Sequence, residues 1–79
     1  MSDKLIESAT QLLDYVDNGD YMTALSYFEA EVREVLDSME AHENQALLDI
    51  MKTTSQLVDE ENWQQILYNC ETMKELLHG

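Results

Sequence analysis

Proline is absent from the 79-residue chain, cysteine occurs once and glycine only twice. A single cysteine excludes an internal disulfide, so the fold does not depend on one, which suits a reducing compartment. Apolar residues occur only in short runs, which argues against a membrane-spanning segment. The first residues lack the basic region and apolar core of a signal peptide. We therefore expect a cytoplasmic protein that does not enter a membrane.

Basic residues are also scarce, with 4 Lys and Arg against 17 Asp and Glu and a formal charge of -13. This balance argues against direct binding to nucleic acid or anionic lipid, because both require basic surfaces. It favours a basic partner, a solubilising role, or both. The length fits one domain, and the 44% of apolar residues is enough for a thin core if they are well patterned.

Helical periodicity runs through the whole sequence, and Asn18-Gly19 is the only strong breaker. We predict a first helix over about 3–17 with Ser2 as its N-cap, and Gly19 in the left-handed position after it. Asp20 is expected to cap a second helix that ends near 41–43. Asn44 and Asn62 are predicted to cap two further helices. The predicted fold is all-α, an antiparallel bundle of three or four helices, in which the third helix either continues the second or stands apart.

A shift of 42 residues aligns the second half of the sequence with the first. Val16-Asp17 then matches Val58-Asp59, and Asp20-Tyr21 matches Asn62-Trp63. Two readings are open: an internal repeat, or independent amphipathic patterning in each half. We expect a single helical domain over 1–79, with hairpin-like units at about 3–43 and 44–78.

Constellations typical of enzymes are nearly absent. Only His42 and His78 are available as imidazoles, and neither lies in a zinc-protease motif. Cys70 falls on an apolar stripe and is expected to be a buried, inert thiol. The sequence therefore predicts no catalytic residues, no metal site and no cofactor.

Candidate binding residues are of two kinds. Some apolar side chains fall outside the main stripe of each helix, where they either widen the core or form an exposed contact patch: Ile6, Leu13, Met22, Tyr27, Leu48 and Tyr68. The charge is uneven as well, since residues 1–45 hold 11 acids and two bases, whereas 46–79 hold six acids and two bases. The second predicted helix carries a row of acids at Glu31, Glu34, Asp37 and Glu40, which we expect either to be solvated or to face a basic partner.

Two resemblances centre on the first turn. Tyr15, Gly19, Tyr21, Ala24 and Phe28 match the spacing of signature positions in a tetratricopeptide helix pair. The second half departs from that pattern at Glu61, Ile66 and Cys70, and the 42-residue period is longer than in that family.

The stretch from Leu12-Leu13 through Asn18-Gly19-Asp20-Tyr21 to Leu25 and Glu29 resembles the first hairpin of the small helical export chaperones of the flagellar type III system, in particular the filament-cap chaperones. The resemblance spans roughly 5–36. It implies an ATP-independent chaperone that clamps an amphipathic segment of an export substrate.

Together these patterns predict a small, acidic, non-catalytic protein-binding module that acts as a chaperone, an adaptor or an inhibitor. Its expected partner is another protein with a basic surface or an amphipathic helix, and a homodimer through the apolar residues is a further option. The alternative is an acidic mimic of nucleic acid, or an immunity-type protein, that inhibits a basic nucleic-acid-binding protein or nuclease and is encoded by a phage or mobile element.

Overall fold

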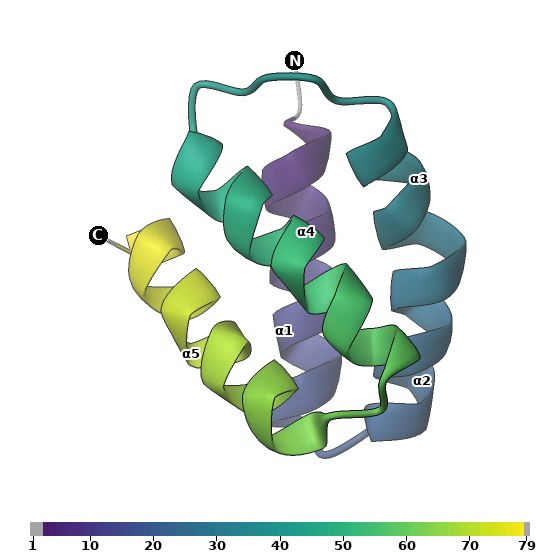
Figure 1. The fold of residues 1–79 in the computed structure, drawn as a ribbon. Helices are drawn as coiled ribbons and strands as arrows, with labels where there is room; N and C mark the ends of the chain where they lie inside the picture. The colour runs from purple at the N-terminus through teal and green to yellow at the C-terminus, as the bar shows by residue number, and fades with distance from the viewer. Residues whose placement is uncertain (1–2, 79) are drawn as a thin grey trace. The chain divides into compact units, whose positions relative to one another are not determined.

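The computed structural model describes residues 3–78, and over that range the regular structure consists only of helices (Figure 1). The protein divides into two compact units, Met1–Glu40 (unit 1) and Ala41–Gly79 (unit 2). This all-α architecture, with a helical hairpin in each unit, confirms the predicted fold class. The boundary between the units lies slightly before the predicted position at 43/44.

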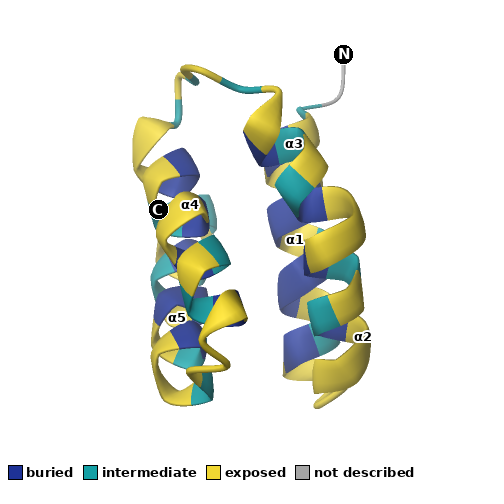
Figure 2. Ribbon diagram, turned by 45° about the vertical axis from the view of Figure 1, so that its right-hand side comes forward, coloured by how far each residue is buried: buried dark blue, intermediate teal, exposed yellow. Residues whose placement is uncertain are grey.

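Unit 1 pairs helix α1 (Lys4–Asp17) with a second, antiparallel helical rod (Figure 1). That rod runs without a break through α2 (Tyr21–Tyr27), the π-helical segment η1 (Phe28–Val32) and α3 (Arg33–Asp37). The buried side of α1 includes Leu5, Ala9, Leu12 and Val16, which recur at spacings of three and four residues. Figure 2 shows both buried and exposed residues on each helix of this unit, as expected for amphipathic helices with one face in the core.

Unit 2 pairs α4 (Gln45–Asp59) with the antiparallel α5 (Trp63–His78). The buried side of α4 includes Leu47, Met51, Thr54 and Val58, at spacings of three and four residues. On α5 the buried side chains include Ile66, Cys70 and Met73. The segment between α3 and α4 is not helical, so the alternative in which the third helix continues the second is wrong.

The turns of the two units repeat the same hydrogen bonds at a spacing of 42 residues. Gly19 N–H donates to the Val16 carbonyl at 3.0 Å, and Asp20 N–H donates to that of Tyr15 at 3.0 Å. The equivalent bonds, from Glu61 to Val58 and from Asn62 to Leu57, both measure 3.1 Å. This pair of bonds is the Schellman motif, which closes a helix through one left-handed residue. The two halves therefore share a turn geometry as well as a hydrophobic pattern.

Three of the predicted helix caps are present. Asp20, Asn44 and Asn62 each accept a hydrogen bond from a backbone N–H in the first turn of the following helix. The first helix is capped differently from the prediction, because the Asp3 carboxylate accepts from Leu5 N–H at 3.0 Å. Ser2, the predicted cap, lies outside the described residues.

The π segment in the second rod was not predicted. Within it, Arg33 N–H donates to the Phe28 carbonyl five residues earlier. The buried residues Ala24, Phe28, Val32 and Leu36 follow one another at intervals of four. In a regular α-helix that spacing drifts by about 40° at each step, because four residues exceed one turn. A π turn holds more residues than an α turn, so it offsets this drift. The four buried side chains therefore stay on one side of the rod.

The second rod ends at Asp37, earlier than predicted, with Ser38 as its C-cap. The Ser38 hydroxyl donates to the Val35 carbonyl at 2.8 Å, and Ser38 N–H donates to the carbonyls of Glu34 and Val35. Glu40 therefore lies beyond the helix, and its predicted place in a helical row of acids is wrong.

Candidate interaction surface

The two helices of unit 1 each contribute one ring to a pair of packed tyrosines. Tyr15 on α1 and Tyr27 on α2 pack edge to face, with ring centroids 5.5 Å apart and planes at 62°. Both side chains are half-buried. Part of each side chain is therefore accessible, and α1 and the second rod carry the exposed acids Glu7, Asp14 and Glu31.

Two acidic side chains affect the pKa of Tyr27. Partial burial raises the pKa of Tyr27 above its usual 10.0, and Glu31, Tyr15 and Glu7 raise it further. Glu7 belongs to α1, whereas Glu31 belongs to η1. The two carboxylates thus act on one phenol from opposite helices.

Further acids extend this surface along each helix. Glu34 lies one turn beyond Glu31, and Asp14 lies two turns beyond Glu7, so each falls on the same side of its helix as its predecessor. All four carboxylates are exposed. We call this surface the acidic face, and it comprises Glu7, Asp14, Tyr15, Tyr27, Glu31 and Glu34.

The predicted apolar patch does not form as expected. Leu13 is only 6% exposed and Leu48 is 0% exposed, so both belong to the core. The buried sides of α1 and α4 are wider than one stripe, and on α1 the buried side also takes in Ser8, whose hydroxyl donates to the Leu5 carbonyl at 3.0 Å. The prediction that Leu13 and Leu48 contact a partner is therefore wrong for this folded state.

The remaining apolar candidates of unit 1 are exposed but separate. Ile6 is 38% exposed in the first turn of α1, and Met22 is 77% exposed in the first turn of α2. Because the helices are antiparallel, these first turns lie at opposite ends of the hairpin (Figure 1). Tyr21, beside Met22, is also exposed, at 42%. Ile6 and Met22 consequently do not form one patch.

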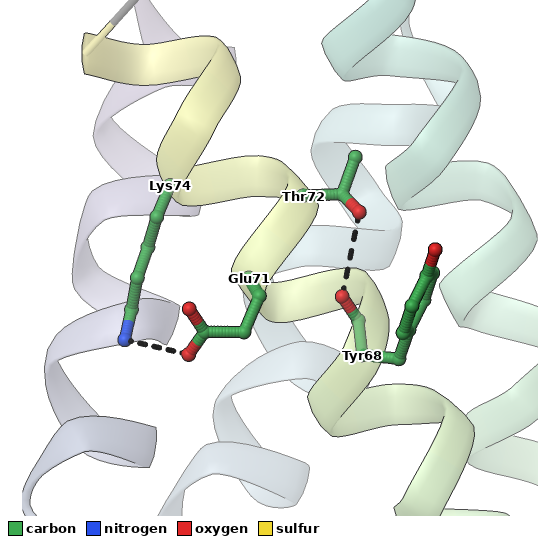
Figure 3. A network of polar contacts seen from close by, with 4 residues as sticks. All are labelled: Tyr68, Glu71, Thr72 and Lys74. Atoms are coloured by element: carbon green, nitrogen blue, oxygen red, sulfur yellow. Dashed lines mark hydrogen bonds and ion pairs between the residues drawn. The ribbon is translucent and has the colours of Figure 1, made fainter.

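Tyr68 is the exposed apolar candidate of unit 2, at 67%. Its backbone carbonyl accepts from the Thr72 hydroxyl at 3.4 Å, and the nearby ion pair joins Lys74 to Glu71 at 3.3 Å (Figure 3). The Glu71 side chain is 72% exposed, so this pair contributes little to stability. Tyr68 stands as a single exposed ring on α5.

One buried polar contact was not predicted. Asn69 is 3% exposed, and its amide donates to the Thr54 hydroxyl at 3.1 Å, which itself donates to the Ile50 carbonyl at 2.7 Å. This series of hydrogen bonds links α5 to α4. The sequence held one signal for the burial of Asn69, because this residue directly precedes Cys70, which falls on the apolar side of the helix.

Metal binding and membrane crossing have no structural support among residues 3–78. Over that range, no group of three or more His, Cys, Asp or Glu side chains has the arrangement needed to hold a metal ion. Cys70 is buried, at 2% exposure, as predicted. Within the same described part, no helix combines the length and apolar content required to cross a bilayer.

Comparisons with known proteins add no relative. No family model, curated protein or solved structure matches the sequence significantly.

Proposed function

We propose that the protein is a non-catalytic binding module that recognises a basic partner protein through the acidic face of unit 1. The observation that carries this proposal is the convergence of Glu7 and Glu31, from two helices, on Tyr27. Helices hold the backbone of these groups in place, so little backbone ordering opposes binding.

The composition of the acidic face suits such a partner. Exposed carboxylates attract Lys and Arg side chains and accelerate the encounter with a basic surface. Tyr15 and Tyr27 supply apolar area and phenol hydroxyls, a combination enriched at protein interfaces. Unit 1 holds ten acids and two bases, a net charge of -8, whereas unit 2 holds seven acids and two bases, a net charge of -5, and this difference supports unit 1 as the unit that meets the partner.

A chaperone that clamps an apolar helix has less support. An apolar helix would need a continuous apolar surface, but among the apolar candidates of unit 1 Leu13 is buried, and Ile6 and Met22 lie at opposite ends of the hairpin. The same burial removes Leu13 and Leu48 from a homodimer through an apolar strip. Within the proposed class, an adaptor or inhibitor that binds through charge is therefore favoured.

Mimicry of nucleic acid is a second candidate, favoured by the row of exposed acids Glu31, Glu34 and Asp37. Residues three apart on a helix are separated by about 4.5 Å along its axis, so these acids form a regular row of negative charge, as the phosphates of a DNA strand do. A mimic competes with DNA for its target. If the captured partner stays bound to this protein in excess DNA, mimicry of nucleic acid is excluded. Recognition of a basic surface that does not bind DNA is then the function left.

The proposal is tested by comparing two charge-matched triple variants in capture of partners from a lysate of the native host. Glu7→Gln, Glu31→Gln and Glu34→Gln together neutralise the acidic face. Glu60→Gln, Glu71→Gln and Glu75→Gln remove the same charge from exposed positions of unit 2. Loss of a captured basic protein with the first variant alone supports the proposal, whereas equal loss with both contradicts it.

A further inference from the structure

We propose that Asn18 is the site of spontaneous deamidation in this protein, and that the folded turn of unit 1 holds the reaction back. Asn18 and Gly19 are both exposed, and Gly19 has no side chain to shield its backbone nitrogen. Nothing lies within 4 Å of the position that a Cβ on Gly19 would occupy. Asparagine is among the thermolabile residues, and this one is followed by the least hindered possible neighbour.

The reaction proceeds through a cyclic imide. The deprotonated Gly19 nitrogen forms a bond to Cγ of Asn18, the bond from Cγ to the amide nitrogen of Asn18 breaks, and that nitrogen leaves as ammonia after taking up a proton. Water then opens the ring at either carbonyl, to give aspartate or isoaspartate at position 18. One water is consumed and one ammonia is released, with no change in oxidation state.

The folded turn keeps the reacting atoms apart. Asn18 has ψ of -1°, so the Gly19 nitrogen lies on the same side of the Cα–C bond as the Asn18 backbone nitrogen. Ring closure needs the Gly19 nitrogen on the side of Cβ instead. The substituents at Cα are spaced by roughly 120° about that bond, so closure requires a rotation of about this size. That rotation breaks the bond from Gly19 N–H to the Val16 carbonyl and the bond from Asp20 N–H to the Tyr15 carbonyl. Conversion therefore requires the turn to open.

The other asparagines provide internal controls. Asn44 is followed by Gln45, Asn62 by Trp63 and Asn69 by Cys70, so the Cβ of the following residue crowds the attacking nitrogen in each case. Asn69 is also buried and hydrogen-bonded to Thr54. These three positions should convert more slowly than Asn18 even in the unfolded state.

Conversion of Asn18 should destabilise the turn between α1 and α2. Aspartate at position 18 places a third carboxylate beside Asp17 and Asp20, at the C-terminal end of α1, where the helix dipole disfavours negative charge. Isoaspartate adds one atom to the backbone, so the two hydrogen bonds of the Schellman motif can no longer both form. Each product should therefore loosen the hairpin of unit 1.

The test incubates the full-length protein at mildly alkaline pH, with and without denaturant, and follows each asparagine by peptide mass spectrometry. In denaturant we expect Asn18 to convert ahead of Asn44, Asn62 and Asn69. In the folded protein we expect conversion at Asn18 to be at least about tenfold slower. Equal rates with and without denaturant, or equal rates at all four asparagines in denaturant, would overturn the proposal.

A pair of variants tests whether the turn itself is the gate. Asp20→Ala removes the cap next to Asn18, and Asn62→Ala removes the equivalent cap in unit 2. Asp20→Ala should raise the rate at Asn18 without denaturant by more than Asn62→Ala does. Equal increases would show that conversion follows global unfolding and would contradict gating by the turn.

Discussion

At the scale of single residues, the two left-handed turn positions offer a matched comparison. Gly19 has φ of 75° and Glu61 has φ of 55°, at equivalent places in the two Schellman motifs. Glycine adopts this conformation without strain, whereas a residue with a Cβ is disfavoured there. The two units thus form the same turn with residues that differ in the conformational cost of a positive φ.

Exchanging residue types at these positions should change stability in opposite directions. Gly19→Ala should lower the free energy of unfolding by about 1 kcal/mol, because the cost is conformational and an added Cβ meets nothing within 4 Å. Glu61→Gly should raise it by up to about 1 kcal/mol, since relief of strain outweighs the greater freedom of the unfolded state. Urea denaturation measures both values, and a change of the same sign in the two variants would be inconsistent with equivalent turns.

The phenol of Tyr27 provides a second residue-scale test. Its pKa is raised in the folded state, so folding favours the neutral form. The resulting stability is fully present below the unfolded pKa, near pH 10, and is lost as the pH rises through the higher folded pKa. Glu31→Gln should lower the pKa of Tyr27, as followed by ultraviolet absorbance of the phenolate, because Glu31 is the largest charge effect upon it.

Glu34→Gln is the control for this titration. Glu34 is not among the groups that raise the pKa of Tyr27, so the variant should leave the tyrosine titration unchanged while removing the same charge. An identical shift in both variants would indicate a general effect of net charge, and would argue against a local contact with Glu31.

At the scale of helices, the link between Thr54 and Asn69 joins α4 to α5. Thr54→Val leaves the buried Asn69 amide without its acceptor, which should cost about 1–3 kcal/mol of unfolding free energy. The double variant Thr54→Val with Asn69→Leu removes both polar groups and should recover part of that loss. Chemical denaturation of the single and double variants checks this, and additive losses would show that the two side chains are not coupled.

Much of the helical organisation follows from the sequence, because period and capping are local properties. The positions of Asp20, Asn44 and Asn62 before amphipathic stretches were sufficient to place three helix starts. The π segment was not predictable in this way, because it depends on how a four-residue spacing is kept against a neighbouring helix. The early end at Asp37 was missed because the apolar pattern extends to Met39, while Ser38 closes the helix.

At the scale of the whole molecule, the candidate surface could be predicted only in part. The exposure of Glu31, Glu34 and Asp37 followed from the helical period. The periodicity could not decide whether Leu13 and Leu48 widen the core or stand outside it, because burial depends on what packs against the helix. The effect of Glu7 on Tyr27 could not be predicted from the periodicity either, because it depends on how α1 pairs with the second rod.

The net charge of -13 acquires a specific interpretation in this arrangement. Much of it is the ordinary outer face of amphipathic helices, which keeps a protein soluble. The acidic face differs in that two of its carboxylates, Glu7 and Glu31, act on the half-buried Tyr27 from opposite helices. The proposed function assigns partner recognition to this face and a mainly solubilising role to the acids of unit 2.

The most direct test of this assignment is the dissociation constant of the captured partner, measured by calorimetry at low and physiological salt. The protein with its natural sequence should bind more weakly at the higher salt, as expected for contact between opposite charges. Neutralising Glu7, Glu31 and Glu34 should weaken binding at low salt by at least about tenfold, or about 1.4 kcal/mol. The matched variant at Glu60, Glu71 and Glu75 should bind nearly as the natural sequence does. Equal weakening by both variants, or affinity independent of salt, would contradict recognition through the acidic face.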